Sequence, residues 1–466
     1  MSGDVDALAR ALAAQPERPE LRFDLANALL AAERPEEAAA QFRYLLERYP
    51  DHVGVLTNLG NALHTMGRHA EALEQYRRAV ALRPEVAGAL NNVGNVLMAL
   101  QRPEEAEPYL RRAVQADPNY AQAANNLGGA LLALDRPAEA LEWFRRAMAL
   151  DPDPFHATFG AAIAQLTLGD YRGGWRDYEA RWRDPRFTID VPDYTAPTWD
   201  GGGVLTGKRM LLHCEQGLGD SIQFVRYAPL VRQRGAHVVL QVQEPLAGLV
   251  AHLADEVVPQ GKIARDEPVP AHDLRCPLLS LPRAFGTRLA TIPAGAPYLA
   301  AEPARIAAWC DRLGPATKRR IGVAFSGSPE HPDDALRSIP AAHLLAALPD
   351  AEIHVLQRDI RPADEAALGP VHVHSADLTD FRDTAALLAC MDLVVSVDTS
   401  IAHLAGAMGR PVWILLQFAG DFRWLRERTD SPWYPSARLF RQPRARDWET
   451  PLAALSAALT TIRHPQ

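Results

Sequence analysis

A 34-residue period dominates the amino-terminal part of this chain. Three columns of residues share the period between residues 19 and 152, and each column is made of one residue type. They are Pro50, Pro84, Pro118 and Pro152; Ala38, Ala72, Ala106 and Ala140; and Gly60, Gly94 and Gly128. A fixed period of this length indicates small supersecondary units that bury their apolar faces only against their neighbours. The segment therefore predicts a stacked array without a single globular core.

Each unit has the pattern of two closely packed helices. Gly and Ala let the helix backbones approach, large apolar residues fill the space between them, and Pro ends the second helix. The pattern resembles the tetratricopeptide repeat (TPR). A degenerate fifth unit follows, and the bulk of Trp175 and Trp182 suits a cap that packs against another domain. We expect a TPR superhelix over residues 1–186, with four repeats and this capping repeat.

One polar column lies within the first helices of the repeats. It consists of Asn58, Asn92 and Asn126, and Asn61 and Asn95 lie three residues further on. Asparagine is a middling helix former, and its amide offers both a donor and an acceptor. The column resembles the asparagine ladder of O-GlcNAc transferase, which implies a groove that grips an extended peptide. The alternative is that these amides bond to neighbouring helices or are solvated.

The second half of the chain has the pattern of an α/β protein. After a segment rich in Pro, Asp, Thr and Gly over residues 187–204, a strand, a glycine turn and a helix open a Rossmann-like lobe, expected over residues 205–315. A second such unit starts near residue 320 and predicts a lobe over residues 316–466. The expected fold is α plus α/β: a TPR solenoid followed by two Rossmann-like lobes of the GT-B type, with the site between them.

Composition and charge disfavour several kinds of partner and site. The chain has 49 Lys and Arg against 57 Asp and Glu, a net charge of −8, so nucleic acid is an unfavourable partner. No apolar run approaches the roughly 20 residues that span a bilayer. Four dispersed cysteines without a CxxC pair disfavour a disulfide framework and a zinc site. The acidic amino terminus lacks the pattern of a secretory signal, and we expect a cytoplasmic protein.

The most informative motif follows an apolar strand. Asp398, Thr399 and Ser400 form a short turn at the expected start of a helix, and His403 lies about one turn in. Free backbone N–H groups and the helix dipole at such a start bind a nucleotide diphosphate well. The alternative is that Asp398 and Thr399 only cap the helix.

The order of the motifs resembles the heptosyltransferase family of GT-B enzymes (glycosyltransferase family 9). In that family a glycine-Asp turn comes first, a Ser-Gly turn and a basic residue follow, and D-T-x-x-x-H comes last. The matching residues here are Gly217, Gly219 and Asp220; Ser326, Gly327 and Arg337; and Asp398, Thr399 and His403.

The resemblance implies a role for each matched residue. Asp220 is the expected catalytic base, with a helix cap as the alternative role, and Glu215 is the reserve candidate. Arg337 is expected to neutralise the leaving diphosphate, where the family commonly has Lys; the alternative is a surface charge. Gln357, Asp421 and Trp424 are candidate donor contacts, although Trp424 and nearby aromatics fit a core equally well. No cofactor or metal is expected, since the nucleotide sugar is a co-substrate and Arg337 and a helix start supply positive charge.

Together these observations predict a glycosyltransferase that moves a sugar from a nucleotide-sugar donor to a protein held by the TPR groove, on Ser or Thr. Flagellin is one acceptor suggested by domain analogy. Two alternatives stay open: a heptosyltransferase-like enzyme with a glycan or lipid-linked acceptor, and a scaffold that has lost activity. The sequence leaves the donor sugar, its nucleotide, the acceptor and the oligomeric state undetermined.

Overall fold

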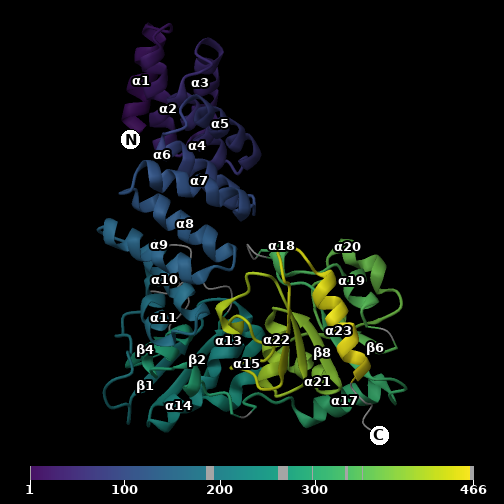
Figure 1. The fold of residues 1–466 in the computed structure, drawn as a ribbon. Coiled ribbons are helices and arrows are strands. Elements are labelled where there is room, and N and C mark those ends of the chain that lie inside the picture. The colour runs from purple at the N-terminus through teal and green to yellow at the C-terminus, as the bar shows by residue number, and fades with distance from the viewer. Residues whose placement is uncertain are drawn as a thin grey trace. The chain divides into compact units, whose positions relative to one another are not determined.

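The computed structural model describes residues 2–184, 194–260, 271–295, 297–330, 334–348 and 350–461. They form two compact units, Met1–Ala164 and Gln165–Gln466, which we describe separately (Figure 1). The division falls inside the degenerate fifth repeat, ahead of the boundary predicted at residue 186. The second half of that repeat therefore belongs with the α/β unit.

The first unit consists of antiparallel helix pairs. The helices are α1 (Ser2–Ala14), α2 (Pro19–Ala31), α3 (Pro35–Arg48), α4 (Val53–Thr65), α5 (His69–Leu82), α6 (Ala87–Ala99), α7 (Pro103–Ala116), α8 (Ala121–Ala133) and α9 (Pro137–Leu150), followed by the start of α10 (Phe155–Thr167). The second helix of each pair, α3, α5, α7 or α9, ends two residues before a proline of the 34-residue column. Proline cannot continue a helix without a clash and a lost hydrogen bond, so the column sets the repeat boundary.

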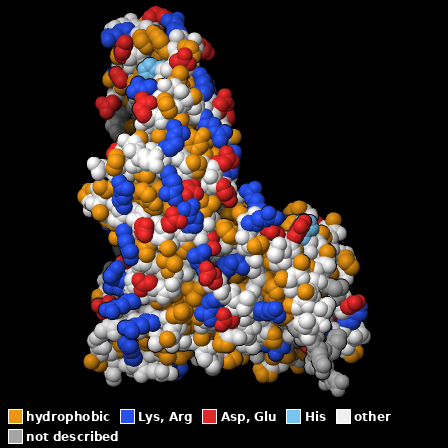
Figure 2. Space-filling model, in the orientation of Figure 1, with side chains coloured by type: hydrophobic (Ala, Val, Ile, Leu, Met, Phe, Trp, Pro, Cys, Tyr) orange, Lys and Arg blue, Asp and Glu red, His pale blue; other side chains and the backbone are white. Residues whose placement is uncertain are grey.

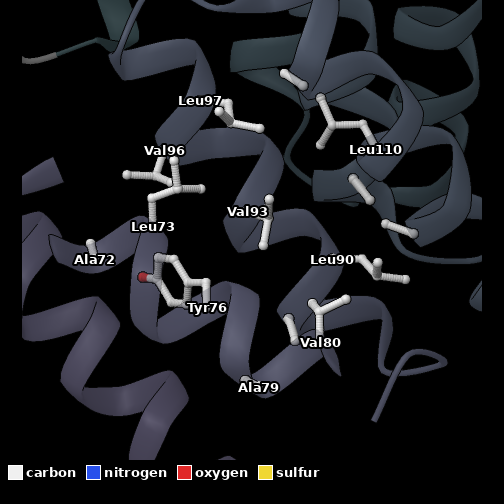
Figure 3. Packing of buried hydrophobic residues seen from close by; sticks show 14 of the residues in the cluster. Ala72, Leu73, Tyr76, Ala79, Val80, Leu90, Val93, Val96, Leu97 and Leu110 are labelled. Atoms are coloured by element: carbon white, nitrogen blue, oxygen red, sulfur yellow. The ribbon is translucent and has the colours of Figure 1, made fainter. Parts of the chain in front are cut away.

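The glycine column is explained by close helix contact. A Cβ added at Gly60 would lie 2.5 Å from the ring of Tyr76, and one at Gly128 would lie 2.7 Å from the ring of Phe144. The alanine column is fully buried. Figure 3 shows the resulting core between two repeats, where Tyr76 and Val80 of α5 and Leu90 and Val93 of α6 contribute to one cluster. These contacts confirm the predicted solenoid of helix pairs.

The outer surface of the first unit carries paired charges. An Arg and a Glu three residues apart form an ion pair in four successive repeats: Arg34–Glu37, Arg68–Glu71, Arg102–Glu105 and Arg136–Glu139. In Figure 2 blue and red side chains are accordingly mixed along the visible face. Exposed pairs of this kind add little stability, and they leave no strong field of one sign on this face.

The second unit contains two parallel sheets. The first, in the order β3-β2-β1-β4, is formed by β1 (Arg209–His213), β2 (His237–Gln243), β3 (Glu256–Gln260) and β4 (Leu274–Pro277). The second, in the order β10-β9-β8-β5-β6-β7, is formed by β5 (Arg320–Ala324), β6 (Glu352–Val355), β7 (His372–Val373), β8 (Leu393–Val397), β9 (Val412–Leu416) and β10 (Ala437–Arg441). The parallel α/β architecture predicted for this half is confirmed.

Helices connect these strands and cover the sheets (Figure 1). In the first lobe they are α13 (Leu218–Phe224), α14 (Ala228–Gln233), α15 (Glu244–Val250) and α16 (Leu281–Ala284). Then follow α17 (Pro303–Leu313), α18 (Asp334–Arg337), α19 (Ala341–Ala346), α20 (Pro362–Glu365), α21 (Phe381–Ala389), α22 (Ser400–Ala407) and α23 (Glu449–Thr461). Short 3-10 turns lie between them, including η8 (Phe422–Trp424).

The strand order of the second sheet locates its binding crevice. Strands β5, β6 and β7 follow one another toward one edge of the sheet, and β8, β9 and β10 then follow one another toward the other edge. This is the doubly wound arrangement. The reversal lies between the neighbouring strands β5 and β8. Ligands of such sheets bind outside the carboxyl ends of the strands at this reversal. The loops after β5 and β8 are therefore the expected walls of a site.

The end of the fifth repeat packs into the α/β unit through α11 (Tyr171–Asp177) and η1 (Tyr178–Arg183). Trp175 is buried, and its ring contacts Phe224 of the first lobe and Phe422 of the second edge-to-face. Trp175 thus packs against both lobes within the second unit.

Part of the predicted linker belongs to the first sheet. The Trp199 N–H donates to the Arg275 carbonyl at 2.7 Å, and the Arg275 N–H donates to the Pro197 carbonyl at 3.1 Å. Residues 197–199 therefore pair along β4. Residues 185–193 lie outside the described residues.

Candidate functional site

The start of α22 presents unused hydrogen-bond donors. Thr399 is its N-cap residue, yet the Thr399 hydroxyl lies 3.0 Å from the Ser396 hydroxyl and makes no capping bond. Within the described part of the chain, the N–H groups of Ser400, Ile401 and Ala402 have no hydrogen-bond partner. The alternative of a simple Thr399 cap therefore does not describe this helix. Three free N–H groups at the positive end of the helix dipole can receive an anion.

Arg337 lies beside this helix start. Its Nη1 donates to the Asp398 carbonyl at 3.1 Å, and its side chain is only 18% exposed. A Cβ added at Gly327 would lie 2.5 Å from Arg337 Nη2, so this glycine is what lets the guanidinium pack against the loop after β5. The guanidinium of Arg337 is thus fixed by packing and a hydrogen bond at the point where the strand order of the second sheet reverses. It is not a solvated surface charge.

Gln357 and Ser326 support the same loop. Gln357 accepts from the Phe325 N–H through Oε1 and donates from Nε2 to the Ser326 hydroxyl, both at 2.9 Å. Both side chains are buried. In this structure Gln357 fixes the loop after β5, and its predicted contact with the donor stays a prediction.

Asp220 accepts hydrogen bonds from a backbone N–H and from a guanidinium. Its Oδ2 accepts from the Gly217 N–H at 3.0 Å, and its Oδ1 accepts from Arg423 Nη2 at 2.5 Å. The first bond is the helix cap that was the alternative role for this residue. The side chain nevertheless stays 21% exposed.

Arg423, which no sequence motif predicted, contacts the candidate base Asp220. Its Nη1 donates to Asp421 at 2.8 Å and its Nε donates to Gln223 Oε1 at 2.7 Å. The guanidinium is almost fully buried and lies over the ring of Phe422. Arg423 therefore links Asp220 of the first lobe to Asp421 of the second. Asp421, one of the predicted donor contacts, also caps η8.

The start of α13 lies against α22. A Cβ added at Gly219 would lie 2.9 Å from His403 Cδ2 and 3.6 Å from Ser400 Cα. Only a residue without a side chain allows this approach. The Gly217–Asp220 loop of the first lobe and the Asp398–Ser400 turn of the second thus converge on one place.

His403 is buried beneath this junction, and Asp398 beside it is half-buried. His403 Nδ1 lies 2.9 Å from the Tyr434 hydroxyl, and its Nε2 lies 3.7 Å from Asp398 Oδ1. Burial, followed by the neighbouring cations Arg423, Arg226 and Arg337, lowers the pKa of His403 well below its usual range. The imidazole is therefore neutral. Burial and then the charge of Asp421 raise the pKa of Asp398 to about 6.

Trp424 lies in the core. It has no exposed surface, and its ring stacks on His403 with the centroids 5.3 Å apart. The alternative that the aromatics after β9 are core residues describes Trp424, Trp433 and Tyr434, all of which are buried.

Glu215 has a buried partner. Its Oε1 accepts from Arg181 Nη2 at 2.9 Å, and the same nitrogen donates to the Ser280 hydroxyl at 2.8 Å. Burial raises the pKa of Glu215 to about 7, and the charge of Arg181 opposes that rise. Glu215 thus connects the last repeat to the loop after β1. The geometry makes Asp220 the more accessible of the two predicted base candidates.

The asparagine column of the first unit is internally bonded. Asn58 Nδ2 donates to Asn27 Oδ1 at 2.7 Å, Asn92 Nδ2 to Asn61 Oδ1 at 3.2 Å, and Asn126 Nδ2 to Asn91 Oδ1 at 2.9 Å. Asn95 Nδ2 lies 3.4 Å from His64 Nε2. The alternative of bonds to neighbouring helices therefore describes one donor each of Asn58, Asn92, Asn95 and Asn126, whereas Asn61 Nδ2 donates to Asn58 Oδ1 of the same helix at 3.5 Å. The five predicted asparagines stay half-exposed.

Asn27 and Asn91 extend the ladder, because they accept from Asn58 and Asn126. Asn27 lies one period before Asn61, so the 34-residue spacing contained the signal.

One group among the described residues could hold a metal. Glu352, His354 and His372 place their ligand atoms within 4.8 Å of one another, on β6 and β7. Glu352 is the first residue of β6, so the group starts at the strand end opposite the candidate site.

No helix of the described chain has the length and apolar character needed to cross a membrane.

Comparisons with known proteins agree with both halves of this description. Residues 5–53, 23–87 and 85–153 match family models of the tetratricopeptide repeat, and residues 365–416 match glycosyltransferase family 9 (heptosyltransferase). The matched glycosyltransferase segment contains β8, the Asp398–Ser400 turn and α22. The chain thus combines tetratricopeptide repeats with a segment that matches glycosyltransferase family 9.

Among curated proteins, the chain is similar to Protein FlbA of Caulobacter vibrioides, at 29% identity over 339 residues. The match covers 65% of this chain and spans about half (54%) of the length of FlbA. Among solved structures, the repeats are similar to YrrB, described as a TPR protein with an unusual peptide-binding site, with 22% identity, a TM-score of 0.33 and coverage of 40% of this chain and 95% of that one. The repeats are also similar to a MamA fragment from Desulfovibrio magneticus RS-1, with 22% identity and a TM-score of 0.33. That match covers 37% of this chain and 97% of the MamA fragment.

Proposed function

We propose that this protein is a GT-B glycosyltransferase that transfers a sugar from a nucleotide-sugar donor to a protein. The observation that carries the proposal is the uncapped start of α22 beside Arg337, at the strand reversal of the second sheet. Free N–H groups, a helix dipole and a guanidinium together suit the diphosphate of a nucleotide sugar. The family 9 match covers this helix start.

The proposed reaction is an in-line displacement. The acceptor oxygen bonds to the anomeric carbon while the bond from that carbon to the diphosphate oxygen breaks. Asp220 takes the proton of the acceptor hydroxyl, and Arg337 and the N–H groups of α22 stabilise the charge that develops on the diphosphate. Because these groups supply the positive charge, the reaction is proposed to need neither metal nor cofactor. A nucleotide-sugar donor favours the cytoplasm as the place of reaction.

The proposed acceptor is a protein segment that binds along the asparagine ladder and is modified on Ser or Thr, with flagellin as one candidate. Asn58, Asn92 and Asn126 each use one donor within the ladder. For Asn92, Asn95 and Asn126, no hydrogen bond to the side-chain carbonyl oxygen is found within the described residues. Such oxygens can accept from the backbone N–H groups of an extended peptide.

The family 9 description supports a second candidate, a heptosyltransferase-like enzyme with a glycan or lipid-linked acceptor. Under it, changes in the asparagine ladder leave transfer unaffected, because the repeats dock the enzyme and do not hold the substrate.

A donor screen by thermal shift tests the shared part of both candidates. UDP, ADP, GDP, dTDP and CMP sugars are added singly, and a ligand at 100 times its Kd should stabilise the fold by about 2.7 kcal/mol. Arg337→Met should abolish the shift. Arg312→Met, which removes an exposed ion pair with Asp377 in the same lobe, should keep it. If no nucleotide sugar shifts the wild-type transition, the scaffold alternative replaces both candidates.

A further inference from the structure

Two cysteines that are far apart in the sequence meet on the second unit. Cys310 lies on α17 and Cys390 follows the last residue of α21. Their Sγ atoms are 2.9 Å apart, although 80 positions separate them in the chain. All four cysteines of the protein are free thiols. Local spacing in the sequence does not reveal this pair, because the two cysteines come together only through the fold.

The packing of α17 against α21 holds the two sulfurs together. Arg305 of α17 pairs with Asp383 of α21, and Arg312 pairs with Asp377 just before α21, at 2.5 Å. Cys390 Sγ also lies 3.4 Å from the Ala386 carbonyl. A disulfide has an S–S distance of about 2.03–2.05 Å. The sulfurs therefore need to approach by only about 1 Å to bond.

We propose that Cys310 and Cys390 form a thiol–disulfide exchange site that reacts with low-molecular-weight disulfides such as oxidised glutathione. The Cys310 thiolate attacks one sulfur of the small disulfide, which gives a mixed disulfide on Cys310 and releases one small thiol. The Cys390 sulfur then attacks Cys310 Sγ and releases the second small thiol. The two protons of the protein thiols end on the two released thiols. One small disulfide is reduced and one protein disulfide is formed.

Exposure sets the order of the two attacks. Cys310 is exposed, whereas Cys390 is half-buried. Burial and then the neighbouring Cys310 sulfur raise the pKa of the Cys390 thiol to about 12, so Cys390 is the poorer first nucleophile. Cys214 and Cys276 are both buried, and burial raises their thiol pKa values as well. They serve as internal controls because they stay protected while the protein is folded.

The test treats the full chain with excess oxidised glutathione and then counts thiols by maleimide labelling and intact mass. The wild type should lose two thiols and two hydrogens without an adduct, and peptide mapping should join residues 310 and 390. Cys390→Ser should stop at one glutathione on Cys310, and Cys310→Ser should not react. Dithiothreitol should restore both thiols.

Three outcomes would overturn the proposal. The first is a stable mixed disulfide on wild-type Cys310 with Cys390 still free. The second is reaction of the Cys310→Ser variant at Cys390. The third is equal loss of all four thiols, which would assign the reaction to unfolded chains.

Discussion

Arg423 Nη2 donates to Asp220 Oδ1 at 2.5 Å, across 203 positions of sequence and from one α/β lobe to the other. The same guanidinium holds Asp421 and Gln223, so its position is fixed from three sides. Asp220 accepts from Gly217 as well, and both of its oxygens are thereby oriented. If Asp220 is the base, Arg423 positions it.

Arg423→Lys should therefore lower kcat by at least about tenfold, because a lysine ammonium cannot reproduce the fork that joins two carboxylates. Asp220→Asn should lower kcat about 10²–10⁴-fold and leave the affinity for the donor nearly unchanged. The double variant should be no slower than Asp220→Asn alone, since Arg423 acts through Asp220. Transfer rates under saturating donor check this prediction. Effects that multiply in the double variant would show that Arg423 acts independently.

The predictions that succeeded rest on local patterns. The repeat columns record contacts between adjacent helices, such as Gly128 against Phe144, and adjacent helices are close in sequence. The start of α22 was predicted within one residue, because a buried strand followed by Asp-Thr-Ser is a local signal.

The contacts that were missed join distant segments. Arg423 meets Asp220, Arg181 meets Glu215, and Cys310 meets Cys390 through the packing of loops and helices. Periodicity contains no information on such pairs. Trp424 was ambiguous for a related reason: an aromatic after a strand packs in a core or lines a site, and only the tertiary fold decides.

The asparagine ladder gives a prediction for the acceptor. Asn92→Ala removes a half-exposed amide from the middle of the ladder and should raise the KM for a protein acceptor about 3–10-fold, the value of one net hydrogen bond. kcat and donor hydrolysis without acceptor should not change. Glu74→Gln, an exposed substitution on a second helix, is the control. An unchanged KM in Asn92→Ala would favour a glycan or lipid-linked acceptor.

Two adjacent glycines of α8 give a prediction for stability. Gly128→Ala places a Cβ 2.7 Å from the Phe144 ring, whereas nothing lies within 4 Å of a Cβ at Gly129. Gly128→Ala should destabilise the repeats by about 1–3 kcal/mol through overpacking. Gly129→Ala should stabilise them by about 0.5–1 kcal/mol, because alanine is the better helix former. Calorimetry of both variants checks the signs. The same sign for both would contradict the packing argument.

The half-buried carboxyl of Asp398 gives a prediction for pH dependence. Its pKa rises from 3.8 to about 6 on folding, so between these values the folded protein binds more protons than the unfolded chain. The free energy of unfolding therefore falls as the pH rises through this window, by up to about 3 kcal/mol at 1.36 kcal/mol per unit. Asp398→Asn lacks this contribution. Its melting temperature should rise relative to wild type between pH 4 and pH 6 and keep a constant difference above pH 7. A difference that does not change with pH would show that Asp398 ionises normally in the folded protein.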